Sequence, residues 1–94
     1  MTHYVFLRFK KGYLTNEIFL SMKERFLALA DAVDGVSDCH VERNIAERDV
    51  SMDFMMTCKM SSPELLPVFL KHPLHLAIAS DTDPHVDLRV TFDY

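Results

Sequence analysis

Three histidines are the side chains of this sequence that could do chemistry together. His72 and His75 stand three residues apart around Pro73, and His3 lies near the N-terminus. On a continuous helix, residues three apart share a face. An imidazole with its ordinary pKa of about 6.5 takes up or releases a proton near neutral pH. If the fold gathers these residues, a neutral imidazole would lie beside a carbonyl or enol group of a bound molecule.

Two interpretations of this cluster remain open at the level of sequence. In the functional one, His75 is an acid/base and His3 is a polar anchor in an otherwise apolar cavity. In the structural one, His72 caps a helix, while His3 and His75 satisfy backbone groups, because buried polar groups need hydrogen-bond partners whatever their role.

Apolar side chains expected to face the same interior would form the walls of such a cavity. Small-molecule pockets are mostly apolar and contain a few placed polar groups. The candidate catalytic residue is His75, and the candidate ligand-binding residues are His3, Val5, Phe26, Phe54, Phe69, His72 and His75.

Other chemistries are not indicated. No acidic residue or cysteine stands at a familiar metal-ligand spacing from the histidines, and the His-Glu-x-x-His pattern is absent, so we expect no metal. With only Gly12 and Gly35, the chain has no glycine-rich loop that could hold phosphates. No serine lies in a nucleophile-elbow pattern. We therefore predict no cofactor.

Composition limits the partners. The 94 residues are 49% hydrophobic and 26% charged, a balance typical of one globular domain, 1–94. A net charge of −4 offers no basic surface for nucleic acid. The chain has no apolar run of about 20 residues and no secretory-signal layout at its start, so we expect no membrane association and a cytoplasmic location.

Two cysteines, Cys39 and Cys58, are too few for a disulfide scaffold. In a reducing compartment they are most simply free thiols. They would lie opposite each other if the chain turns near position 48, and a disulfide is then conceivable. Their redox state stays open.

The pattern of apolar residues predicts the order of elements. Strands are expected over 3–10, 36–45, 52–60 and 87–94, where aromatic and β-branched residues or period-two alternation prevail. A helix is expected over 16–33, because its apolar residues recur at intervals of three and four. A second helix should begin within 61–64 and a third should cover 74–80. The order β-α-β-β-α-β predicts an α+β, ferredoxin-like fold.

Helix boundaries have local signals. Thr15 or Asn16 can cap the first helix, and Gly35 suits a left-handed residue after its end. Ser61 with Glu64, or Ser62 with Pro63, would start the second helix. Within it, Pro67 is expected to weaken the hydrogen bonding. Asp81 to Pro84 is expected to be a turn.

One face of the predicted sheet needs a cover. Both helices should pack on one face, which leaves Tyr4, Phe6 and Met55 on the other. Burying such side chains against a second sheet is favourable. We therefore expect a face-to-face homodimer, with a monomer that tolerates some exposed apolar surface as the alternative.

Several motifs resemble the stress-responsive A/B barrel domain family, called Dabb, over nearly the entire chain. The strongest is the segment from Phe69 to His75, which resembles the family's Tyr-x-x-His-Pro-x-His. The other markers are His3 with Val5 to Lys10, Asp34-Gly35-Val36, Asn44 and Phe92-Asp93-Tyr94. The resemblance implies a dimeric α+β barrel in which two protomers join through their sheets.

The resemblance says less about activity. Related plant members cyclise polyketide-type substrates in a pocket between sheet and helices, with a histidine of the His-Pro-x-His segment as acid/base. Phe69 replaces the family's tyrosine here, which removes a hydroxyl group and argues against cyclase chemistry. Pocket binding is unaffected.

Three hypotheses for function follow. The first is a domain that binds a small apolar or aromatic ligand. The second is a cofactor-free enzyme, polyketide cyclase-like or monooxygenase-like, that uses His75. The third is a stress-related structural dimer without a pocket. A cavity that holds His3 and His75 would favour the first two.

Overall fold

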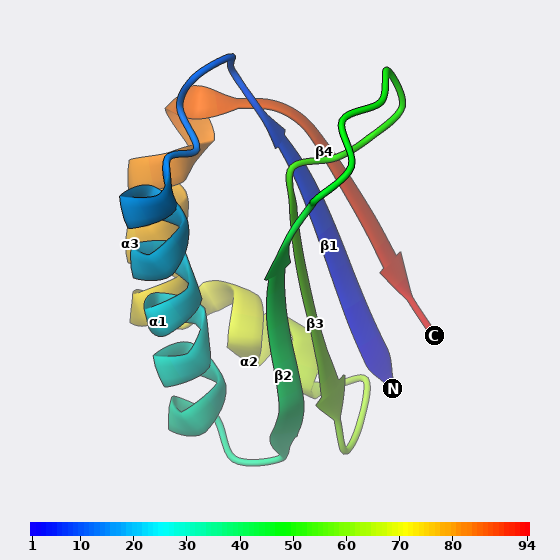
Figure 1. Ribbon diagram of the computed structural model, residues 1–94. Helices are drawn as coiled ribbons and strands as arrows, with labels where there is room; N and C mark the ends of the chain where they lie inside the picture. Colours follow the sequence, from blue (N-terminus) through cyan, green and yellow to red (C-terminus); the bar gives the residue numbers. More distant parts are fainter.

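Four strands form one antiparallel sheet in the computed structural model, which describes residues 1–94. The strands are β1 (Thr2–Phe9), β2 (Val36–Arg43), β3 (Phe54–Met60) and β4 (Val86–Asp93), and their order in the sheet is β2-β3-β1-β4. The helices are α1 (Asn16–Ala32), α2 (Leu65–Lys71), α3 (Pro73–Thr82) and the short 3₁₀ helix η1 (Asp83–His85). The predicted α+β, ferredoxin-like protomer is confirmed (Figure 1).

The main core lies between the sheet and the helices. The apolar stripe of α1 contributes Met22, Phe26 and Leu29, and the C-cap Val33 continues it, as the spacing predicts. From β3, Phe54, Met56, Cys58 and Met60 point into this core, while the residues between them do not. The alternation therefore identified the inner face of β3 correctly.

Helix α1 has the predicted ends. Thr15 is the N-cap, and its Oγ1 accepts a hydrogen bond from the backbone N–H of Ile18 at 3.2 Å. Gly35 has φ +88°, the left-handed conformation that glycine adopts without strain. A Cβ at Gly35 would lie 2.6 Å from Cδ1 of Leu65 and 2.7 Å from Oγ of Ser61. Glycine at this position therefore serves both the turn and the close approach of α2.

The second helix differs from its prediction. It begins at Leu65, because Ser62 and Glu64 bond to each other in a preceding turn: the backbone N–H of Glu64 donates to Ser62 Oγ at 3.2 Å. Pro67 does not weaken the helix as expected. It is the third residue of α2, where a backbone N–H has no acceptor within the helix.

Two further boundaries differ from the prediction. The connection between β2 and β3 is longer, from 44 to 53, and Asn44 closes it: its backbone N–H donates to the carbonyl of Asp53 at 3.0 Å and its Nδ2 to that of Met52 at 2.7 Å. Helix α3 runs on to Thr82, past the predicted end at 80. The turn expected over 81–84 is replaced by the end of α3 and by η1.

The sheet face away from the helices is uncovered (Figure 1). In the ladders Tyr4 pairs with Phe92, and Phe6 pairs with Val90 and Met55, so these side chains share that face. Tyr4, Phe6 and Met55 are half-buried there, and the β4 residues are more exposed. The exposed apolar side chains of β4 and the C-terminus on this face are Leu88, Val90, Phe92 and Tyr94.

No helix combines the length and the apolar character that crossing a membrane requires.

Candidate functional site

A cavity of about 140 Å³ lies between the helices and the β1–β4 half of the sheet. Its walls are mainly apolar, and its polar groups come from β1, α3 and β4. The lining residues are His3, Val5, Leu7, Phe26, Met56, Leu66, Leu70, His75, Ile78, Ala79, Thr82, Arg89, Thr91 and Asp93.

His3 enters the cavity from β1 and is held by the last strand. It is only 4% exposed, and its Nδ1 lies 2.5 Å from Oδ1 of Asp93. The two residues are direct partners in the β1–β4 ladder. With the Asp93 carboxylate as acceptor, the Nδ1–H of His3 donates this hydrogen bond, which fixes the orientation of the imidazole ring. The sequence interpretation of His3 did not include Asp93.

His75 enters the cavity from α3 between two aromatic rings. Its imidazole meets Phe26 and Phe69 edge to face, with ring centroids 6.4 and 5.6 Å away. Its Nδ1 is buried and has no hydrogen-bond partner. Most such groups in folded proteins are paired, so this unpaired one calls for an explanation.

The electrostatics of the cavity keep His75 neutral. Burial lowers the pKa of His75, and the positive charges of Arg89 and His3 lower it further, while Asp83 acts in the opposite direction. Burial disfavours the charged form of an imidazole, and so does a nearby cation. A neutral imidazole in an apolar cavity can accept a proton or a hydrogen bond from a bound molecule.

His72 has a different position. It is the N-cap of α3, where its Nδ1 accepts a hydrogen bond from the backbone N–H of Leu74 at 3.1 Å. Pro73 is the first residue of the helix, a position that suits proline. His72 does not line the cavity, so the structure separates it from His3 and His75.

Phe54 and Phe69 also lie outside the lining, among the fully buried side chains of the core. Phe69 supports both histidines from behind, because its ring centroid is 6.0 Å from that of His3 and 5.6 Å from that of His75. Of the expected ligand-binding residues, the cavity brings together His3, Val5, Phe26 and His75.

The charged lining residues that sequence reasoning missed are on β4, with Thr91 between them, and the other unpredicted lining residues are Leu7, Met56, Leu66, Leu70, Ile78, Ala79 and Thr82. Arg89, Thr91 and Asp93 line the cavity, opposite Leu7, Val5 and His3 in the ladder. The strict alternation of this strand separates them from Leu88, Val90 and Phe92. That signal was visible in the sequence, but it does not say which face meets the helices.

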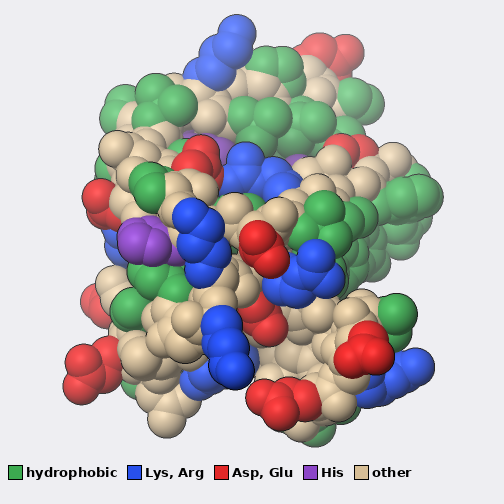
Figure 2. Space-filling model, turned by 90° about the horizontal axis from the view of Figure 1, so that it is seen from above, with side chains coloured by type: hydrophobic (Ala, Val, Ile, Leu, Met, Phe, Trp, Pro, Cys, Tyr) green, Lys and Arg blue, Asp and Glu red, His purple; other side chains and the backbone are tan.

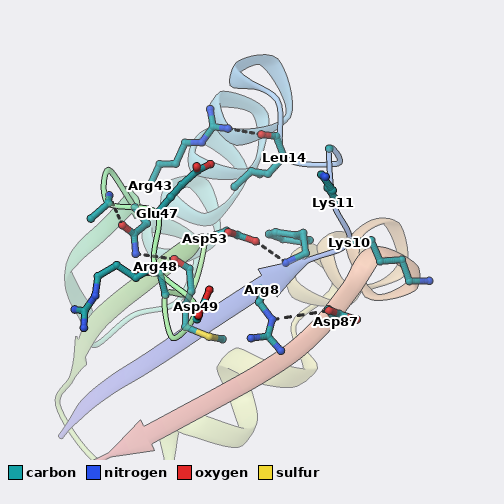
Figure 3. A pocket seen from close by; sticks show the side chains of 16 residues that line it. Arg8, Lys10, Lys11, Leu14, Arg43, Glu47, Arg48, Asp49, Asp53 and Asp87 are labelled. Carbon is teal, nitrogen blue, oxygen red and sulfur yellow. Dashed lines mark hydrogen bonds and ion pairs between the residues drawn. The ribbon is translucent and has the colours of Figure 1, made fainter.

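A second, larger cleft of about 810 Å³ lies at the end of the molecule beside the 44–53 loop (Figure 3). Lysine and arginine side chains gather there among acidic ones, as the view from above shows (Figure 2). Several of its polar groups are paired. Asp53 accepts from the backbone N–H of Phe9 at 2.8 Å, Arg8 lies 3.8 Å from Asp87, and Arg43 bonds to Asn16 at 2.6 Å. This cleft is far more polar than the cavity and contains none of the histidines.

The two cysteines are unpaired thiols. The ladder has a bulge at Asp38 and Cys39, which places both residues opposite Cys58. Burial raises the pKa of Cys39 to about 11 and that of Cys58 to about 12. Both are therefore protonated at neutral pH and are poor nucleophiles. Nowhere in the structure do three His, Cys, Asp or Glu side chains come together as metal ligands.

Comparison with known proteins identifies the family. The stress responsive A/B Barrel Domain (Dabb) profile matches residues 1–94. This chain therefore belongs to the stress-responsive A/B barrel domain family. No curated protein matches the sequence.

Solved structures with the same fold are described in different functional terms. A dimeric ferredoxin-like protein of unknown function from Thermobifida fusca is 15% identical, with TM-score 0.83, over 99% of this chain and 87% of that chain. The hydroxynitrile lyase of Passiflora edulis is 16% identical, with TM-score 0.80, over 99% of this chain and 89% of that chain. SnoaB, a cofactor-independent oxygenase from Streptomyces nogalater, is 16% identical, with TM-score 0.70, over 99% of this chain and 90% of that chain. At these identities the likeness establishes the fold and leaves the activity open.

Proposed function

We propose that this protein is a homodimeric A/B barrel domain that binds a small apolar or aromatic molecule between its sheet and helices. The observation that carries the proposal is the unpaired, buried Nδ1 of His75 in the wall of a mainly apolar cavity. A ligand with one polar group would bury its apolar part in this cavity. Its polar group would be a hydrogen-bond partner for His75.

The cavity volume indicates the size of the ligand. A closed apolar cavity of about 150 Å³ is known to accept one benzene ring, and this one measures about 140 Å³. Burial of one ring removes about 150 Å² of apolar surface from water. At about 25 cal/mol per Å² this gives about 4 kcal/mol, which corresponds to a Kd of about 1 mM. We therefore expect weak but saturable binding of single-ring compounds.

Filling the cavity tests the binding proposal. Ala79 lines it, whereas Ala77 lies on the solvent side of the same helix. We expect calorimetry to show saturable binding of p-cresol to the wild-type protein. We expect that binding to disappear in Ala79→Phe and to persist in the matched control Ala77→Phe. Equal binding to all three proteins, or to none of them, would contradict the proposal.

A second candidate function is cofactor-free acid–base catalysis by His75. The position of its half-buried imidazole, whose lowered pKa favours the neutral form, supports this function, and a hydroxynitrile lyase and a cofactor-independent oxygenase share the fold. In the simplest such step, the imidazole takes a proton from a carbon next to a carbonyl group, which leaves an imidazolium and an enolate. The imidazolium exchanges its proton with solvent, and transfer of a solvent-derived proton back to the same carbon restores both partners.

Isotope exchange distinguishes catalysis from binding. With acetophenone in D₂O, catalysis predicts that the protein accelerates deuterium incorporation into the methyl group, measured by proton NMR. In His75→Gln the rate of deuterium incorporation should fall to the rate in buffer alone. The control His85→Gln should retain it, because His85 stacks on Tyr13 outside the cavity. Exchange that persists in His75→Gln would remove His75 as the base.

The uncovered sheet face supports the dimer. Its apolar side chains come from three adjacent strands, and contiguous apolar patches of this kind mark interaction surfaces. A second copy can cover the patch by a two-fold arrangement in which each sheet buries the other. The relative from Thermobifida fusca is described as dimeric.

A further inference from the structure

The charges in the cavity wall are distributed between its two ends. The ionisable lining residues are His3, His75, Arg89 and Asp93. Asp93 is engaged by His3. Arg89 is the only arginine or lysine in the lining.

The strand separates Arg89 from the acidic end. Arg89 and Asp93 are four residues apart on β4, which at about 3.3 Å per residue places them roughly 13 Å apart along the strand. Thr91 lies between them, opposite Val5. An anionic group beside Arg89 would therefore be well separated from the carboxylate of Asp93.

Arg89 has donors to spare. Its Nη2 donates to Oδ1 of Asp83, and the side chain is 47% exposed. A guanidinium group has five N–H donors, which suit a bidentate contact with a carboxylate. An ion pair this exposed is weak, so it does not prevent the guanidinium from binding a second anion.

The face of β4 turned to the helices is unusual. Leu88, Val90 and Phe92 point away from the helices, and the face over the cavity consists of Arg89, Thr91 and Asp93. A strand over an apolar core ordinarily turns its apolar side inward. Polar residues on this wall suit a ligand that has a polar, charged end in addition to an apolar ring.

We propose that the ligand of this cavity is a single-ring aromatic acid whose carboxylate binds Arg89 while its ring lies against His75. This inference rests on the proposed binding function and adds the substrate class. Arg89 is close enough for its charge to help lower the pKa of His75. Neutralising Arg89 with a bound carboxylate therefore raises the pKa of His75, an effect that a neutral ligand does not produce.

Benzoate and benzamide are the probes, because they are nearly identical in shape and differ in charge. At low ionic strength we expect calorimetry to show that the wild-type protein binds benzoate at least fivefold more tightly than benzamide. Arg89→Gln should reduce the ratio of the benzamide Kd to the benzoate Kd to about one. Arg25→Gln is the matched control, since Arg25 has a comparable exposed ion pair, with Asp81, away from the cavity. It should keep the full preference.

The imidazole signals of His75 give an independent readout. An NMR titration should show that its pKa rises with benzoate and not with benzamide. Benzamide binding without a preference for benzoate, or a preference that survives Arg89→Gln, would overturn this inference and leave the binding proposal standing. If neither probe nor p-cresol binds, both fail.

Discussion

At the residue scale, His75 is the side chain on which the account depends. Its surroundings are two aromatic rings and apolar side chains, with Arg89 and His3 as nearby sources of positive charge. Each of these disfavours the imidazolium form. Asp83 opposes the effect without reversing it. The result is a histidine that is neutral at physiological pH and still available for hydrogen bonding.

This lowered pKa predicts a pH dependence of stability. Between about pH 6.5 and the lower pKa of the folded state, the unfolded chain binds a proton at His75 that the native protein does not. Stability from this residue is therefore complete above pH 6.5 and is lost as the pH falls. The slope is at most about 1.4 kcal/mol per pH unit.

Urea unfolding of the wild-type protein and His75→Gln between pH 5 and 8 measures this contribution. His3, Arg89 and Asp83 are common to both proteins, so their own titration largely cancels in the difference. We expect the wild type to lose more stability than the variant as the pH falls. Parallel curves for the two proteins would show that His75 titrates normally.

At the element scale, Gly35 shapes the turn that connects α1 to β2. Both Gly12 and Gly35 have positive φ, but only Gly35 has neighbours where a Cβ would lie. Gly12→Ala should therefore lower the free energy of unfolding by only about 1 kcal/mol, because alanine disfavours the left-handed conformation. Gly35→Ala adds contacts with Leu65 and Ser61 and should cost about 2–3 kcal/mol. Chemical denaturation of both variants tests this, and equal losses would refute the role of the contacts.

How far the sequence predicts each element depends on whether its signals are local. The stripe of α1 and the alternation of β3 reveal their buried faces, because on each the apolar residues lie on one side. On β4 the same alternation leaves the orientation open. Its inner face follows from pairing with β1, where His3 meets Asp93, a partner 90 residues away.

The candidate site was likewise predictable only where its signals are local in the sequence. His3 and His75 were predictable as a pair because their residue type indicates acid–base chemistry. Arg89 and Asp93 were not, since only the β1–β4 ladder brings them to the cavity. For His72 the structural interpretation is confirmed: Pro73 starts a new helix and His72 is its N-cap, outside the cavity.

At the scale of the whole molecule, the two faces of the sheet differ in what covers them. The inner face closes a cavity beneath the helices, and the outer face is left apolar and open. In the proposed homodimer the outer faces cover each other. The helical sides and their cavities then remain accessible in both subunits.

Charge on the outer face should separate the subunits. Phe92 is 62% exposed on this face, and Leu20 is 60% exposed on α1. Light scattering at micromolar concentration should give twice the 10.9 kDa chain mass for the wild-type protein and for Leu20→Lys. For Phe92→Lys we expect a mass closer to one chain. A wild-type mass of one chain, or dimers in all three proteins, would refute the sheet-to-sheet arrangement.

The most direct test of the account is nitrogen-15 NMR of the histidine side chains during titration with p-cresol. We predict that the imidazole resonances of His75 shift saturably and that those of His40, which is exposed on β2, do not. We also predict that Ala79→Phe abolishes the shift. Resonances of His75 that stay unchanged at saturating p-cresol, or that shift equally in Ala79→Phe, would contradict the claim that this cavity binds ligands against His75.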